Sequence, residues 1–168
     1  MFSQTTEYAL RAMSCLAYAP DSPVSTIDLA TQTKVPPNYL AKVLQILAGE
    51  GLITGRRGVG GGYRLSRPPA EITMLEVINA VNPIERIRQC PLGIKSHGTK
   101  LCSLHRRLDG GAASIIDLYG GITFEDIVRG ESEPRRPLCD TGERSPTGLT
   151  FNGGSISSGT PTGGQGQP

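Results

Sequence analysis

The chain has 168 residues, which suits one domain with a tail, because domains usually run to ~100–150 residues. Its net charge of +2 is too small to indicate a nucleic-acid partner, although residues 21–67 hold six Lys/Arg against three Asp/Glu. The sequence has no apolar run of ~18 residues and no charged-then-apolar leader. We therefore expect a cytoplasmic protein with no membrane segment.

Residues 3–18 have the apolar periodicity of a first helix. Glu7 and Arg11 are four residues apart, a spacing that lets them pair on a helix surface. Cys15 lies beside the apolar stripe, and we expect it to be a small buried hydrophobe rather than a reactive thiol. The stripe comprises Thr6, Ala9, Leu10, Met13, Leu16 and Ala17.

A helix-turn-helix is predicted for residues 25–49. Ser25 precedes TIDLATQTKV and suits the N-cap of a short helix. After a turn at residues 34–37, Pro37 suits the first position of a second helix. The apolar stripe of this second helix is Leu40, Val43, Leu44 and Leu47.

The opposite face of the second helix carries Asn38, Lys42 and Gln45, which the helical spacing places together. Such side chains can read base edges and phosphates. An ordinary solvated face is the alternative for an isolated helix. Tyr39 is open to two interpretations, because it could contact DNA or pack beneath the helix.

A glycine-tipped hairpin follows, with LITGRR and YRLSR as strands around Gly58, Gly60, Gly61 and Gly62. Glycine permits positive φ, and arginine suits a narrow, negatively charged minor groove. Arg56, Arg57, Arg64 and Arg67 cluster here. A phosphate-binding loop would need a Gly-Lys-Ser/Thr ending, which this sequence lacks. A helix plus a basic hairpin predicts a winged helix, with DNA contacts from Asn38, Tyr39, Lys42, Gln45, Arg56, Arg57, Gly58, Gly60, Gly61 and Tyr63.

Beyond the hairpin, Thr73 and Glu76 form a capping box for a helix that Pro83 ends. A loop from Cys90 to Cys102 leads into a long helix, whose apolar positions are Leu101, Leu104, Leu108, Ala112, Ile115 and Tyr119. Gly110 and Gly111 are poor helix formers, so this helix is expected to bend or fray there.

A short last helix is predicted for FEDIVR, with a cap from Thr123 and Asp126 and a stop at Gly130. Residues 131–168 are rich in Gly, Ser, Thr and Pro and are expected to be disordered. Cys139, within that tail, is interpreted as an incidental thiol.

The run YLAKVLQILAGEGLITGRRGVGGGYRLSRPPAEIT resembles the winged-helix signature of the IscR/NsrR-type, or Rrf2, family of bacterial transcription regulators. EYALRA, CPLG and LCSLHRRLD extend the likeness over roughly residues 1–130. The resemblance implies a mainly α fold with a small β-hairpin. It implies a DNA-binding domain at 1–82 and a Cys/His loop with a dimerisation helix at 83–130, and the composition adds the tail at 131–168. The resemblance implies a homodimeric repressor or activator that binds an imperfect palindrome in double-stranded DNA. It also implies sensing of redox state, iron or nitric oxide through an iron–sulfur cluster.

An enzyme is not expected, because no nucleophile, base and orienting group can be assembled. The only histidines are His97 and His105, and both lie near cysteines.

The candidate metal ligands depart from the pattern of the family. Its cluster-binding members carry three cysteines, each separated by five residues, whereas this chain has Cys90, Ser96 and Cys102. Histidine can replace some cluster cysteines. His97 and His105 are therefore candidates, as is Glu7, which aligns with an acidic ligand that some relatives donate across the dimer. Zinc is the alternative for two Cys and two His. A third interpretation is a cluster-free protein with reduced thiols.

Overall fold

The computed structural model describes residues 3–58, 60–93 and 100–130. Helices dominate, and the strands form a two-stranded antiparallel sheet. The expected tail at 131–168 and the candidate ligand His97 lie outside the described residues. In chain order the elements are α1 (Gln4–Tyr18), α2 (Thr26–Thr33), α3 (Pro37–Gly49), β1 (Ile53–Arg56), β2 (Gly62–Leu65), η1 (Pro69–Glu71), α4 (Met74–Val81), α5 (Ser103–Gly120) and α6 (Phe124–Arg129).

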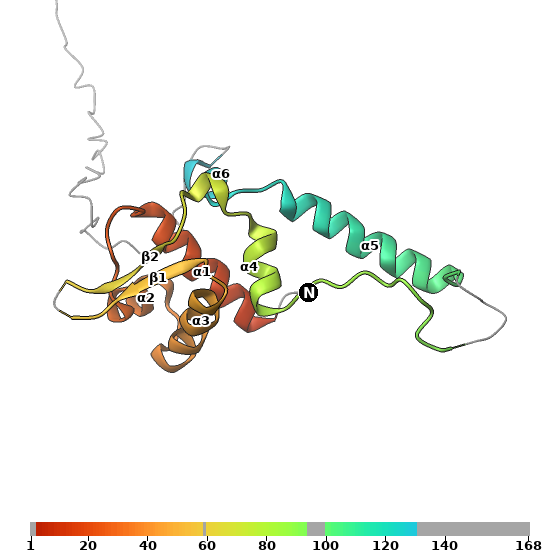
Figure 1. The fold of residues 1–168 in the computed structure, drawn as a ribbon, viewed down its shortest axis with the longest axis horizontal. Helices are drawn as coiled ribbons and strands as arrows, with labels where there is room; N and C mark the ends of the chain where they lie inside the picture. The colour runs from red at the N-terminus through yellow and green to blue at the C-terminus, as the bar shows by residue number, and fades with distance from the viewer. Residues whose placement is uncertain (1–2, 59, 94–99, 131–168) are drawn as a thin grey trace, which may run out of the picture.

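The core forms around α1, which packs against α2, α3, α4 and α6 (Figure 1). Ser3 caps α1 by accepting a hydrogen bond from the amide of Thr6. Ala9, Met13 and Leu16 are fully buried, and Cys15 is buried beside them, as the periodicity predicts. Small side chains on α1 let the other helices approach it closely.

The helix-turn-helix forms as its sequence signals predict. The Ser25 hydroxyl caps α2 by accepting from the amide of Asp28 at 3.1 Å. The turn passes through Lys34, whose φ of 56° is left-handed, and α3 begins at Pro37. The whole predicted stripe of α3 is buried, comprising Leu40, Val43, Leu44 and Leu47.

The predicted hairpin is the β1–β2 pair, in a register that places Ile53 opposite Leu65 and Arg56 opposite Gly62. Val24, just before α2, bridges to Tyr63 of β2 through hydrogen bonds of 2.9 and 2.8 Å. Through this bridge, β2 pairs with the residue just before α2 as well as with β1, which joins the wing directly to the helix-turn-helix.

The second half of the described chain leaves the core and returns. Residues after α4 run outward beside α5, and α5 leads the chain back to α6 (Figure 1). Thr73 and Thr123 carry the predicted capping boxes of α4 and α6, and they also form a β-bridge. Phe124 is fully buried, so α6 belongs to the core.

The prediction that α5 would bend or fray at its glycines is wrong as far as fraying is concerned, because α5 is continuous from Ser103 to Gly120. Gly110 and Gly111 both have helical backbones, with open space where a side chain would stand. No residue of α5 is buried. The helix therefore contributes little to the core of this chain and exposes most of its surface.

Candidate nucleic-acid interface and metal centre

The outer face of α3 is exposed at each candidate DNA contact. Asn38, Lys42 and Gln45 all lie at the surface, opposite the buried stripe. Tyr39 does not pack beneath the helix, since 58% of it is exposed. Its ring meets Tyr8 of α1 edge to face, with centroids 6.4 Å apart. This contact fixes the ring at the edge of the exposed face.

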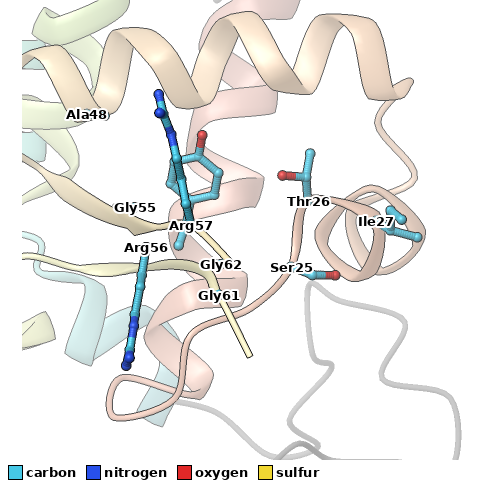
Figure 2. Close-up of a pocket in the computed structure, with 10 residues that line it drawn as sticks. Ser25, Thr26, Ile27, Ala48, Gly55, Arg56, Arg57, Gly61 and Gly62 are labelled. Carbon is cyan, nitrogen blue, oxygen red and sulfur yellow. The ribbon is translucent and has the colours of Figure 1, made fainter. Parts of the chain in front are cut away.

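The wing carries arginines without partners. Arg56, Arg57 and Arg64 are exposed, and none makes an ion pair or side-chain hydrogen bond with another described residue. Arg56 and Arg57 project to opposite sides of the hairpin, and Arg57 extends toward a neighbouring helix (Figure 2). The wing therefore presents positive charge in more than one direction.

A groove of about 530 Å³ lies between the wing and the helix-turn-helix. Both the start of α2 and the end of α3 contribute to it, so the wing and the helices form one continuous surface. Its lining comprises Ser25, Thr26, Ile27, Ala48, Gly55, Arg56, Arg57, Gly61, Gly62 and Tyr63.

Two of the wing glycines are needed by the fold. A Cβ on Gly61 would lie 2.3 Å from the carbonyl oxygen of Arg56, and one on Gly62 would lie 2.5 Å from that of Val24. Gly58 and Gly60 have positive φ but open space around them. These two suit a tip that approaches another surface closely.

Tyr63 is half-buried and its backbone is hydrogen-bonded to Val24, so it helps to hold the wing against the helix-turn-helix.

Arg67 differs from the other hairpin arginines because its side chain makes hydrogen bonds within the chain. Its Nη2 donates to Glu76 at 2.8 Å and its Nη1 donates to the carbonyl of Glu71 at 3.0 Å. Burial alone would raise the pKa of Glu76, but hydrogen bonds from Thr73 and Arg67 outweigh it and lower that pKa. Sequence reasoning missed this role, since the partners are nine residues apart.

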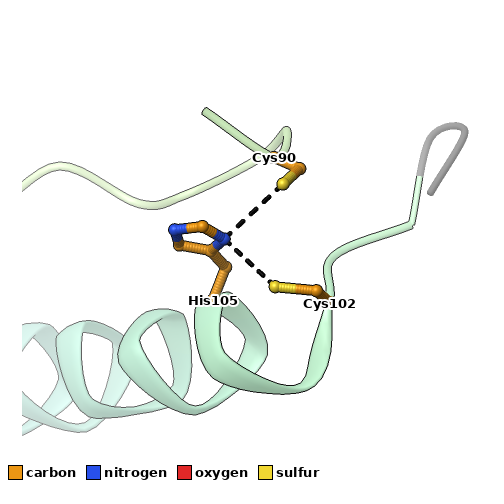
Figure 3. Close-up of side chains that lie close together, drawn as sticks. All are labelled: Cys90, Cys102 and His105. Carbon is orange, nitrogen blue, oxygen red and sulfur yellow. Dashed lines mark hydrogen bonds between the residues drawn. The ribbon is translucent and has the colours of Figure 1, made fainter. Parts of the chain in front are cut away.

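The candidate metal ligands Cys90, Cys102 and His105 converge (Figure 3). The His105 Nδ1 lies 3.2 Å from the Cys102 Sγ and 3.6 Å from the Cys90 Sγ. All three ligand atoms lie within 4.8 Å of one another, and all three residues are half-buried. Access from solvent therefore remains open.

Local structure explains the convergence. Cys102 is the N-cap of α5 but makes no capping bond with its side chain, and His105 lies one turn later. Cys90 belongs to the segment running beside α5. Arg86 and the amide of Ile87 in that segment both donate to Asp109 of α5. Arg86 and Asp109 were not singled out from the sequence, because the two residues are 23 positions apart.

Glu7 does not join this group within the chain, and its carboxylate pairs with Arg11 as the four-residue spacing predicts. The donor chemistry of the three converging residues is compatible with metal binding or cluster binding, because zinc and iron–sulfur sites both use thiolate and imidazole ligands.

A helix-turn-helix with a basic wing is the fold of a DNA-binding protein. Residues 2–130 match the Rrf2 family, described as iron-dependent transcriptional regulators. The chain belongs to this family of regulators, which are not enzymes. Within the described residues, no helix combines the length and apolar character needed to cross a membrane.

Relatives named as HTH-type transcriptional regulators support this membership. One from Aquifex aeolicus is 28% identical over 82% of this chain and 98% of its own length. Another, from Mycobacterium tuberculosis, is 34% identical over 76% of this chain and 86% of its own.

Solved structures share the fold. The Bacillus subtilis global cysteine regulator CymR matches with a TM-score of 0.66 at 22% identity, over 77% of this chain and 96% of that one. T. potens IscR matches with a TM-score of 0.67 at 23% identity, over 81% and 91%.

Proposed function

We propose that the protein is a homodimeric repressor of the IscR/NsrR type. It binds an imperfect palindrome through α3 and the wing, and it senses redox state or iron through the Cys90–Cys102–His105 centre. Residues 1–82 act as the DNA-binding part and residues 83–130 as the sensing and dimerisation part. The observation that carries the proposal is the set of unpartnered cationic side chains on α3 and the wing.

The chemistry of this surface suits DNA. Lys42, Arg57 and Arg64 have no internal ion pair among the described residues, so their charge is available to neutralise phosphates and release counterions. Asn38 and Gln45 carry the amides that pair with adenine in the major groove. Arginine at a glycine-rich tip suits the minor groove.

A second copy of α5 is the proposed partner in the dimer. Leu104, Leu108, Ile115 and Leu118 are 63%, 52%, 40% and 58% exposed. With Gly111 they follow the alternating four- and three-residue steps of a coiled-coil seam. A continuous apolar stripe of this kind favours an interface. Two α3 helices would then face successive major grooves, ~34 Å apart.

The centre is coupled to the dimer through one helix. Cys102 and His105 flank Leu104, the first residue of the seam. A bound group that draws Cys90 onto the start of α5 would therefore stabilise that end of the interface. Its loss or oxidation would loosen the end of the seam and change DNA affinity.

The test is operator binding by fluorescence anisotropy, using a DNA fragment selected from the genome by the wild-type protein. Gln45→Ala should weaken binding by about 1–3 kcal/mol if Gln45 contacts a base. Lys42→Ala should do the same if Lys42 contacts a base, or lower the salt dependence of binding if it contacts a phosphate. Arg129→Ala is the matched control, because Arg129 pairs with Glu125 on α6. Equal affinity of all these variants would reject the interface.

A further inference from the structure

We infer that the Cys90–Cys102–His105 centre holds one tetrahedral ion of the zinc type in place of an iron–sulfur cluster. The inference concerns what the centre binds, and it depends on the proposed function only for the claim that occupancy controls DNA affinity.

The distances fit a shared ion. Zinc–sulfur bonds of about 2.3 Å and zinc–nitrogen bonds of about 2.0 Å at tetrahedral angles separate neighbouring ligand atoms by roughly 3.5–3.8 Å. The observed Nδ1–Sγ distances are 3.2 and 3.6 Å. Only small side-chain movements are needed to receive the ion, so the site is close to preorganised.

An iron–sulfur cluster fits this arrangement poorly. A [4Fe–4S] cluster places each protein ligand on a different iron, a [2Fe–2S] cluster places no more than two on one iron, and the common types take four cysteines. Ligands on different irons must stand apart by the width of the cluster, whereas these three atoms face one point. The position that carries a cysteine in cluster-binding relatives is Ser96 here.

The described residues supply three ligands and no fourth. No further His, Cys, Asp or Glu among residues 3–58, 60–93 and 100–130 joins the group. These three ligands leave the fourth tetrahedral position of the ion to water or to a donor outside the described residues. Two thiolates and an imidazole suit zinc better than magnesium or calcium. The half-buried ligands leave room for exchange.

The anchoring of Cys90 supports a built site. Asp109 receives Arg86 through two hydrogen bonds, of 2.6 and 2.7 Å, and the amide of Ile87 at 2.9 Å. Cys90 follows Ile87 by three residues. The ion pair therefore holds the segment that carries Cys90 against α5, which carries His105 and begins next to Cys102. Less of the chain has to become ordered when the ion binds.

The test uses the full chain, purified without air, stripped with a chelator and titrated with Co²⁺. We expect one Co²⁺ per chain, visible bands of tetrahedral Co²⁺, thiolate charge-transfer absorption and displacement by Zn²⁺. Cys90→Ser and Cys102→Ser should each lose about half of the charge-transfer intensity, and His105→Ala should bind Co²⁺ at least 10-fold more weakly. Arg106→Ala, an exposed neighbour, is the control and should match wild type.

Anaerobic incubation with iron and sulfide tests the alternative, an iron–sulfur cluster at the same residues. Stable uptake of acid-labile sulfide with a brown chromophore would overturn the inference, as would no Co²⁺ binding or a spectrum unchanged in the cysteine variants. Operator affinity is measured on the same samples. A protein that binds operator but shows no Co²⁺ site would contradict the inferred metal centre and leave the proposed DNA binding intact. Co²⁺ binding with no operator affinity removes the proposal and leaves the inference.

Discussion

Arg86 and Asp109 form a two-pronged ion pair that joins the segment leading to Cys90 to the side of α5. The Nε–Oδ1 and Nη2–Oδ2 distances are 2.6 and 2.7 Å, and the amide of Ile87 donates to the same carboxylate. Chiefly because of the hydrogen bonds from Arg86, the pKa of Asp109 is held below its usual value. Asp109 lies one helical turn after His105, so the pair holds the segment that carries Cys90 beside the start of α5.

The ion pair should make the anchoring of this segment dependent on pH. Because the folded pKa of Asp109 is lowered, its contribution is complete above the unfolded value of about 3.9 and is lost as pH falls through the folded pKa. Wild type should therefore resist urea better than Asp109→Asn at neutral pH, and the difference should vanish in acid. A difference that persists unchanged well below pH ~4 would contradict the assignment.

The arginines of the hairpin should separate into two groups by experiment. Arg57→Ala should weaken operator binding and lower its salt dependence by about one unit if it contacts phosphate, with the melting temperature unchanged. Arg67→Ala should instead lower the melting temperature, because Glu76 and the carbonyl of Glu71 lose a donor. Salt-titrated anisotropy and calorimetry on both variants measure the two effects. The wing assignment fails if Arg57→Ala binds like wild type.

A charge in the apolar stripe of α5 should split the proposed dimer. Leu108→Glu places a carboxylate at an exposed position in the apolar stripe, so the fold of each chain should persist while the second α5 is rejected. Sedimentation velocity should report monomers, and operator affinity should fall. Arg106→Glu is the control, because Arg106 is exposed on the face of α5 opposite the stripe. A dimer unaffected by Leu108→Glu would place the interface elsewhere.

Two glycines should respond in opposite directions to alanine. Gly110 has a helical backbone with open space beside it, so Gly110→Ala should stabilise α5 by about 1 kcal/mol. Gly61→Ala should destabilise the wing by about 1–3 kcal/mol, because the new methyl group would meet the carbonyl of Arg56 at 2.3 Å. Chemical denaturation measures both. Stabilisation by Gly61→Ala would show that the wing adopts another conformation.

Local signals in the sequence predicted much of the fold. Ser25, and the pairs Thr73–Glu76 and Thr123–Asp126, cap helices within three residues of themselves, so their consequences can be read without tertiary structure. The buried stripe of α3 was predictable for the same reason. The glycine pattern of the wing was also informative, since two of its glycines are enforced by close backbone contacts.

The rest depended on contacts that periodicity cannot reveal. The sequence stripe on α5 ran through Ala112 to Tyr119, whereas the exposed stripe runs through Gly111 to Leu118. Gly111 has no side chain, so an apolar pattern does not register it. The Arg86–Asp109 pair spans 23 residues and leaves no local trace. The family resemblance pointed to Cys90 and Cys102, and the three-residue step from Cys102 pointed to His105, but no spacing in the sequence places Cys90 beside them.

Two copies of the chain are proposed to recognise operator DNA together, each through its α3 and wing. Hydroxyl-radical footprinting of the wild-type protein on genomic fragments tests this arrangement. We expect two protected regions centred ~34 Å apart on one face of the duplex. Protection should be lost in a protein carrying Lys42→Ala and Arg57→Ala and retained in Arg129→Ala. A single protected region, or full protection by the doubly substituted protein, would contradict it.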